Sequence, residues 1–189
     1  MFTEPRFRQR GLSLIELLIF IIVVGIGVAA VLTAINQGVR ASADPMIRKQ
    51  ALAAAESLIE EIELQPFTYC DPRDANATTA TSTAGCSSAA FSMDNPANWG
   101  SGKTRYGPTF FDNVADYNGF SMSGTLNDVF QQASSNLTGY SASVSVSQVG
   151  ASFSLPNTDV LRITVTVSGS GNSVTLTGFR FRHSPNLVD

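Results

Sequence analysis

The chain has few of the residues on which most enzymes depend. Its 189 residues include one histidine, two cysteines and one tryptophan, and only 14% of them are charged. Because His183 is the only histidine, the sequence contains no multi-histidine metal set and no Ser/His/Asp arrangement. The GSG stretch at 169–171 lies between two strand-like segments, which favours a hairpin turn over a phosphate-binding loop. We therefore expect no enzyme activity and no cofactor.

Basic residues are also scarce. The chain has 12 Lys and Arg against 15 Asp and Glu, and its formal net charge is −3. A nucleic-acid-binding surface needs a patch or stripe of basic residues, and the sequence has none. We therefore expect no nucleic-acid partner.

One segment has almost no charge. Residues 12–35, LSLIELLIFIIVVGIGVAAVLTAI, contain a single charged residue, Glu16, and two hydroxyl residues, Ser13 and Thr33. The run is long enough for a transmembrane helix, which needs about 20 apolar residues. Hydroxyls can bond to carbonyls one turn earlier, but a carboxylate in a membrane needs a partner. Because the run contains no Lys, Arg or His, that partner must come from elsewhere.

The residues before this run are basic. MFTEPRFRQRG carries Arg6, Arg8 and Arg10 against one acid, Glu4, which predicts that the N-terminus stays in the cytoplasm. An ordinary secretory signal would be cut after its apolar region, at a site between small residues. Here a glycine, Gly11, stands before the apolar region instead.

The stretch RGLSLIELL resembles the N-terminal signal of type IV pilins and pseudopilins. The residues that match are Gly11, Ser13, Leu14, Ile15 and Glu16, and Leu12 stands where phenylalanine is commonest. The resemblance implies that a prepilin peptidase removes a leader of residues 1–11 by cutting after Gly11. The same enzyme would methylate the new N-terminus at Leu12, and residues 12–35 would stay as the membrane helix.

The same resemblance implies a role for Glu16 and a location for the chain. Cleavage creates a cationic amine on Leu12, and the Glu16 carboxylate of a neighbouring subunit would pair with it. Because an unpaired buried charge is costly, such pairing favours one axial register between subunits. The chain would cross the inner membrane once with a periplasmic head, meet an inner-membrane assembly platform, and join other pilins or pseudopilins in a surface filament.

Residues 36–66 are predicted to form an amphipathic helix that leads into the head. Apolar residues recur there at spacings of three and four, namely Ile47, Ala51, Ala55, Leu58 and Ile62. Asp44 could cap a new helix with Pro45 in its first turn, or the membrane helix could continue to a kink at Pro45. Pro66 should end it. Glu56, Glu60 and Glu63 share the opposite face, which favours a solvated surface over an acid/base pair.

The two cysteines lie on either side of a polar segment of small residues without periodicity, which is typical of a loop. Cys70 and Cys86 belong to the part of the chain that should reach an oxidising compartment. A close cysteine pair there is more often a disulfide than a metal site. We therefore predict a Cys70–Cys86 disulfide that closes this loop.

The C-terminal third changes to strand-like alternation. Three segments alternate apolar and polar residues, with inward positions at Tyr140, Ala142, Val144, Val146, Leu161, Ile163, Val165, Val167, Val174 and Leu176. Phe179 and Phe181 take the opposite parity, which predicts a β-bulge at Gly178. Three antiparallel strands could cover the helix stripe. The predicted fold class is α+β, a long N-terminal helix packed on an antiparallel sheet in a head of residues 67–189.

One middle segment has the residue types of a calcium loop. FFDNVADYNGF places Asp112, Asp116 and Asn118 before Gly119. The segment lacks the full ligand spacing and the distal glutamate of such loops, and the same residues form ordinary turns. Turns are the favoured reading, and calcium is the alternative.

Several segments beyond the signal resemble minor pilins of the MSHA type of pilus, namely ADPMIRKQALAAAESLIEEIELQPF, FDNVADYNGF and LTGYSASVSV. This similarity implies a structural subunit that helps to initiate or modify a type IV pilus. A minor pseudopilin of a type II secretion system shares the same N-terminal signal and stays open. A membrane-anchored periplasmic binding protein or enzyme, whose match to the signal is chance, is the more distant alternative.

Overall fold

The computed structural model describes residues 13–187, without the side chains of 39–44, 135 and 136. The predicted leader, Gly11 and Leu12 lie outside the described residues. The chain divides into two compact units, one that ends at Pro45 and one, the head, that begins at Met46. Each unit is described by itself below.

A single helix, α1, runs from Leu14 to Leu64 with Pro45 inside it. Of the two alternatives, the continued helix is correct and the cap at Asp44 is wrong, because the helical hydrogen-bond pattern continues through Asp44 and Pro45. Proline removes one backbone donor, but the residues after it are strong helix formers such as Ala, Leu, Lys and Glu. The helix ends close to the predicted stop at Pro66, where Gln65 N–H donates to Ile62 O at 3.1 Å.

The head half of α1 buries the predicted apolar stripe. Ala51, Ala55, Leu58 and Ile62 are at most 5% exposed and belong to the hydrophobic core, and Ile47 packs partly buried against it. The side chains of Glu56, Glu60 and Glu63 are exposed, as predicted. The head is therefore organised around one face of this helix segment.

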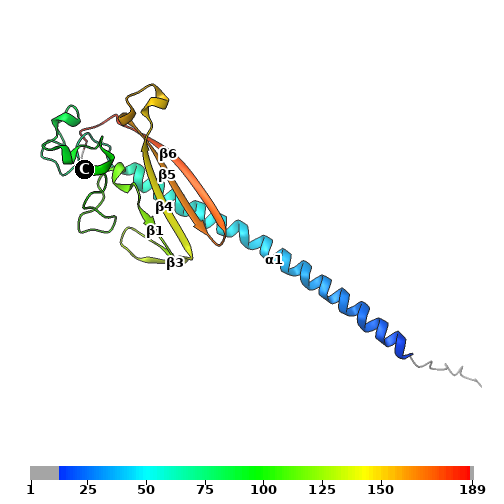
Figure 1. Cartoon of the computed structure of the whole chain (residues 1–189). Coiled ribbons are helices and arrows are strands. Elements are labelled where there is room, and N and C mark those ends of the chain that lie inside the picture. The colour runs from blue at the N-terminus through cyan, green and yellow to red at the C-terminus, as the bar shows by residue number, and fades with distance from the viewer. Residues whose placement is uncertain (1–12, 188–189) are drawn as a thin grey trace, which may run out of the picture. The chain divides into compact units, whose positions relative to one another are not determined.

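The main sheet is antiparallel, with the strand order β1-β4-β5-β6. Its strands are β1 (Ser121–Met122), β4 (Tyr140–Gln148), β5 (Val160–Gly169) and β6 (Asn172–Phe181). Figure 1 shows β4, β5 and β6 side by side along the head half of α1. The three predicted strands and the α+β class are confirmed. The short β1, and a second sheet formed by β2 (Thr125–Asn127) and β3 (Ala133–Thr138), were not predicted.

The predicted bulge at Gly178 is absent, because β5 and β6 pair in one unbroken register in which Ile163 faces Gly178. A Cβ on Gly178 would lie 2.1 Å from Glu63 Oε1 and 3.2 Å from Ile59 Cδ1. The glycine therefore serves the close approach of α1 to the sheet. Arg180 takes the next helix-facing position, and Phe179 and Phe181 lie on the opposite face.

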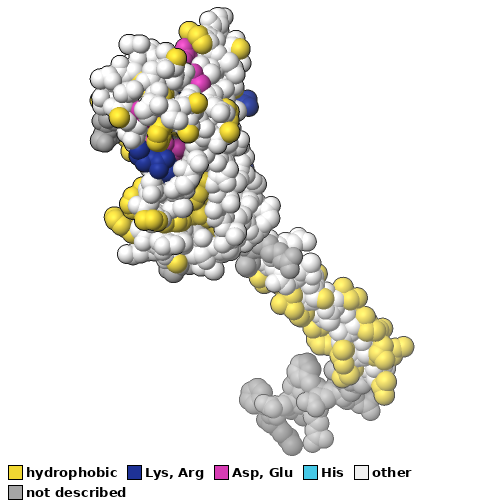
Figure 2. Space-filling view, turned by 60° about the vertical axis from the view of Figure 1, so that its left-hand side comes forward, with side chains coloured by type: hydrophobic (Ala, Val, Ile, Leu, Met, Phe, Trp, Pro, Cys, Tyr) yellow, Lys and Arg dark blue, Asp and Glu magenta, His cyan; other side chains and the backbone are white. Residues whose placement is uncertain are grey.

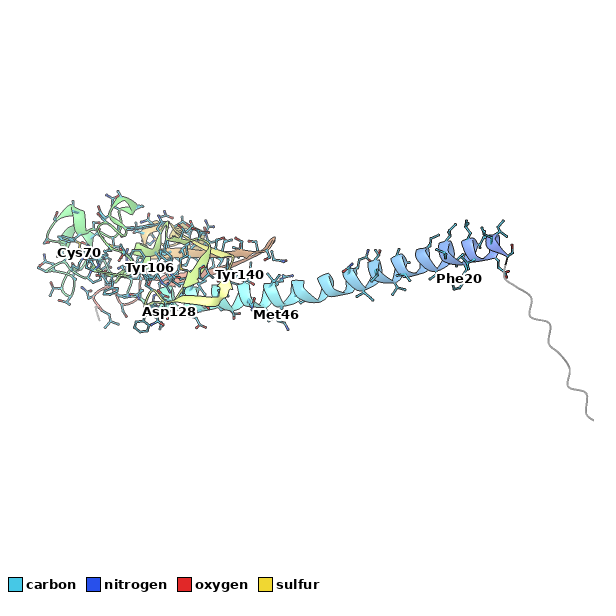
Figure 3. All side chains as sticks on the ribbon, turned by 90° about the horizontal axis from the view of Figure 1, so that it is seen from below. Phe20, Met46, Cys70, Tyr106, Asp128 and Tyr140 are labelled. Atoms are coloured by element: carbon cyan, nitrogen blue, oxygen red, sulfur yellow. A yellow bond between two sulfur atoms is a disulfide. The ribbon has the colours of Figure 1, made fainter. Side chains whose placement is uncertain are left out.

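The rest of the head, as far as Leu187, is irregular and contains six short 3₁₀ helices. They are Thr83–Gly85, Ala89–Phe91, Pro96–Asn98, Val114–Tyr117, Gly150–Phe153 and Asn157–Asp159. Cys70 and Cys86 form the predicted disulfide. Figure 3 places Cys70 at the end of the head opposite Met46. The C-terminal segment also reaches this end, where Tyr69 N–H donates to Pro185 O and Asn186 Nδ2 donates to Ala80 O.

Candidate assembly site

The N-terminal part of α1 presents an apolar surface that nothing in its own unit covers. The most apolar 18 consecutive residues within Leu14–Gly38 have a mean hydropathy of 3.0, and none of them is buried. The helix is long and apolar enough to cross a membrane. Phe20, labelled in Figure 3, is 66% exposed, and Figure 2 shows hydrophobic side chains over the visible face of this segment. A surface of this kind needs lipid or other apolar helices around it.

Glu16 lies in the first turn of this helix. The N–H groups of Glu16 and Leu17 both donate to Ser13 O, at 3.0 and 3.2 Å, so Ser13 is the residue that caps the start of the helix at Leu14. The spacing of Ser13 and Glu16 is that of a capping box, and a carboxylate near a helix N-terminus interacts favourably with the helix dipole. The Glu16 side chain is exposed, and no described residue forms an ion pair with it. The carboxylate is therefore accessible to a partner.

The hydroxyl of Thr33, near the other end of the apolar run, has a hydrogen-bond partner within its own helix. Thr33 Oγ1 donates to Ala29 O at 2.8 Å, one turn earlier, as expected for a hydroxyl in an apolar helix. This bond needs no partner from outside the helix. The Glu16 side chain has no hydrogen bond of this kind among those that the structure describes. Glu16 is therefore the polar side chain of the apolar run that most needs a partner from outside the helix.

The residues suggested as calcium ligands do not converge on one point. The carboxylates of Asp112 and Asp116 both accept from Lys103 Nζ, the second at 2.8 Å. Asn118 Oδ1 instead accepts from Val146 N–H at 2.9 Å on strand β4. Asp116 also accepts from the backbone N–H groups of Gly100, Asp112 and Asn113. A lysine ammonium thus lies where a cation would bind, and calcium binding stays an untested prediction.

Lys103 is the centre of a buried ionic cluster. Its side chain is fully buried, and Nζ also lies 2.7 Å from Asp71 Oδ2. Burial alone would lower the pKa of Lys103, but the nearby carboxylates, Asp116 foremost, raise it. Burial would likewise raise the pKa of Asp71, but hydrogen bonds from Arg73 and Lys103 outweigh it and lower that pKa. Burial raises the pKa of Asp112.

A second buried ion pair joins the helix to the irregular region. Arg105 donates to Glu61 through Nε at 2.8 Å and through Nη2 at 2.6 Å, and Tyr117 OH donates to Glu61 Oε1 at 2.8 Å. Burial and the neighbouring Glu61 raise the pKa of Tyr117, so its hydroxyl stays protonated and donates. This pair was not predicted from the sequence. The available signal was that Glu61 follows Leu58 by three residues and so borders the apolar stripe.

The only described group of residues with metal-ligand spacing is Cys70, Asp74 and Cys86. Both sulfurs are used in the disulfide, and Asp74 accepts from the Ser87 N–H and hydroxyl at 2.9 and 2.8 Å. Burial would raise the pKa of Asp74, but hydrogen bonds from the Asn76 N–H and from Ser87 outweigh it and lower that pKa. The group therefore holds the disulfide loop together and is not arranged as a metal site.

A helix with an uncovered apolar surface and a carboxylate in its first turn defines a candidate membrane-anchored assembly subunit. Residues 6–32 match the family model described as the prokaryotic N-terminal methylation motif. This motif indicates a type IV pilin or pseudopilin, points to a structural subunit rather than an enzyme, and supports membrane anchoring. No curated protein and no solved structure matches the chain.

Proposed function

We propose that the chain is a minor pilin, a structural subunit that helps to initiate or modify a type IV pilus. The observation that carries this proposal is the exposed, unpaired Glu16 carboxylate at the start of an apolar helix within the methylation motif. After cleavage behind Gly11, the amine of Leu12 on a neighbouring subunit supplies the positive charge that Glu16 lacks. The pair sets the axial register between subunits.

The proposed partners follow from this processing. A prepilin peptidase cuts and methylates the chain while Arg6, Arg8 and Arg10 keep its N-terminus in the cytoplasm. The head, from Met46 onward, then lies in the periplasm, where the Cys70–Cys86 disulfide forms. An inner-membrane platform moves the subunit into a filament built from other pilins.

Two features support a minor subunit over the main filament subunit. The run from Leu12 to Ile35 contains no proline, whereas major pilins commonly carry one there that lets the helix partly melt on packing. The disulfide loop follows α1 directly at Cys70–Cys86, whereas many major pilins close theirs near the C-terminus. The similarity of three further segments to minor pilins of the MSHA type makes that pilus the proposed assembly.

The experiment is to delete the gene and to quantify the protein in sheared filaments. We expect fewer pili in the deletion strain and only trace amounts of this chain beside a dominant pilin in wild-type filaments. The protein as the dominant band would overturn the minor role. Pili unchanged in number, together with loss of protein secretion, would identify a pseudopilin of a type II secretion system instead.

A further inference from the structure

Strand β6 is an open edge of the main sheet. It is ten residues long and pairs on one side with β5 in an unbroken register. The β5–β6 turn has positive φ at Ser170 (47°) and Gly171 (83°), which is a two-residue hairpin turn closed by the Gly169–Asn172 pair. In this geometry every second residue of β6, from Ser173 to Phe179, directs its N–H and C=O away from β5.

No described backbone group covers this edge. The backbone hydrogen bonds outside the sheet reach Phe181 and Arg182 but no residue between Asn172 and Arg180. Proteins usually protect such an edge with proline, lysine, an inward charge or a bulge. The β6 sequence, NSVTLTGFRF, contains no proline, lysine or acid, and its register has no bulge. Its only charged residue is Arg180, an inward charge near one end, so the stretch from Ser173 to Phe179 has none of these protections.

A groove of about 430 Å³ lies where this edge meets the head half of α1. Its lining residues are Glu60, Glu63, Leu64, Phe179 and Arg180. Leu64 is 79% and Phe179 is 45% exposed, so both offer apolar contact area. The two glutamates are exposed and form no ion pair with any described residue.

We propose that the β6 edge receives an extended segment of another protein in the same filament, which adds a strand to the sheet. The added strand would carry basic side chains on the face toward Glu60 and Glu63 and apolar or hydroxyl side chains on the face beside Phe179. Backbone hydrogen bonds provide the affinity in this binding mode, and the side chains at alternate positions provide the specificity.

The charges of the groove also determine the register of the added strand. Arg180 Nη2 lies 3.4 Å from Gln65 O, and its Nε is buried without a hydrogen-bond partner. A residue that faces Arg180 must therefore be neutral or acidic, whereas the residues that face Glu60 and Glu63 are basic. The expected segment has Lys or Arg at two alternate positions and, next to this pair on the same face, an uncharged or acidic residue.

The partner is a different protein and not a second copy of this chain. Among the described residues, basic side chains alternate only at Lys103 and Arg105 and at Arg180 and Arg182, and Lys103, Arg105 and Arg182 are buried in ion pairs within the head. This step rests on the proposed function, because a minor subunit is surrounded in its filament mainly by other pilins. The edge thus specifies which neighbour the minor subunit accepts.

The test is photo-crosslinking in cells that assemble filaments, with a photoreactive amino acid in place of Thr175 in the full chain. Thr177→Pro removes one N–H that points away from β5 and leaves the β5–β6 ladder intact. Thr177→Val is the matched control, because it keeps that N–H. We expect a crosslink to an extended segment with alternating basic residues, weakened about tenfold by Thr177→Pro and unchanged by Thr177→Val.

A second variant keeps the test decisive where the proline affects folding. Glu60→Gln with Glu63→Gln leaves the backbone edge intact and should weaken the crosslink several-fold, with Glu56→Gln as the control. A crosslink that survives these changes, that joins two copies of this chain, or that is absent although the protein is in filaments would overturn the proposal. Absence of the protein from filaments would instead contradict the proposed function.

Discussion

At the scale of single residues, the paired carboxylates of the head and the carboxylate of Glu16 differ in where their counter-charges lie. In the head, the carboxylates of Asp71, Asp112, Asp116 and Glu61 are paired with Lys103, Arg73 or Arg105 of the same chain. Glu16 has no counter-charge among the described residues and lies in the most apolar part of the chain. A counter-charge for Glu16 must therefore come from another molecule.

The first prediction concerns Glu16→Ala. Removing a charge from a membrane helix makes insertion easier, so the variant should insert and be cleaved as well as the natural chain. It should fail to join filaments, because the amine of its neighbour then has no partner. The measurement is the ratio of variant in sheared filaments to variant in the membrane. Glu56→Ala, in the same helix but outside the apolar run, is the control, and normal incorporation of Glu16→Ala would refute the register role.

The second prediction concerns Lys103→Met. The substitution leaves the buried Asp116 carboxylate without its cation and leaves Asp71 with Arg73 alone, which should cost about 3–5 kcal/mol of unfolding free energy. Denaturant unfolding of the mature protein in detergent measures the loss. Lys49→Met, on the exposed surface of α1, should change stability by less than about 0.5 kcal/mol. Equal stability of the two variants would show that the cluster contributes little.

The third prediction is the pH dependence of the head. Because the folded pKa of Asp71 is lowered, its contribution is fully present above its unfolded pKa of about 3.9 and is lost as pH falls through the folded value. The folded pKa of Lys103 is raised, so its contribution is present below an unfolded pKa of about 10.4 and is lost as pH rises past the folded value. Asp112, whose pKa is raised, opposes part of the acid loss.

Unfolding free energy should therefore be nearly constant between about pH 5 and pH 9 and fall outside that window. Asp71→Asn should lower stability at neutral pH and flatten the decline below about pH 4. Denaturation curves measured at a series of pH values provide the comparison. An identical acid decline in the two proteins would mean that Asp71 is not the group responsible.

At the scale of elements, the features that follow from the local periodicity of apolar residues could be predicted from the sequence. The stripe from Ala51 to Ile62 and the alternation in β4 and β5 were correct, because each element buries one face and its residues repeat accordingly. The bulge at Gly178 was wrong for a tertiary reason. The glycine gives room to Glu63 of α1, and the phenylalanines on the other face pack on Phe153, with ring centroids 5.4 and 5.2 Å apart.

The ionic clusters could not be predicted because their members are far apart in the chain. Glu61 and Arg105 are 44 residues apart, and Lys103 joins Asp71 to Asp112 and Asp116 across irregular segments without periodicity. The N-terminal features, by contrast, lie within a few consecutive residues, from Arg6 to Glu16. Their roles in processing and assembly could therefore be proposed from the sequence alone.

The fourth prediction concerns the disulfide loop as an element. Replacing both Cys70 and Cys86 with alanine opens a loop that the bridge closes across 16 residues, which should cost about 3 kcal/mol of unfolding free energy. Thiol labelling of the denatured, unreduced natural chain should find no free cysteine. Quantitative labelling would instead rule the bridge out. Denaturant unfolding measures this loss of stability. Opening the loop should also affect the C-terminal segment, because Asn186 donates to two backbone carbonyls of the loop.

At the scale of the whole molecule, the two units have different requirements. The head has its own hydrophobic core, a disulfide and internally paired buried charges. The N-terminal unit has an apolar helix, and none of its most apolar 18 consecutive residues is buried. Such a helix is stable in a bilayer or among other helices, since its backbone is satisfied internally. The N-terminal unit thus needs surroundings that a single copy of the chain does not supply.

The central claim is that this chain is processed as a pilin and enters a filament. The most direct test is mass spectrometry of the N-terminal peptide of the protein recovered from sheared filaments. We predict a peptide that begins at Leu12 with a methylated α-amine and lacks residues 1–11. Recovery of the chain from filaments with residues 1–11 still attached, or with an unmodified amine, would contradict the claim.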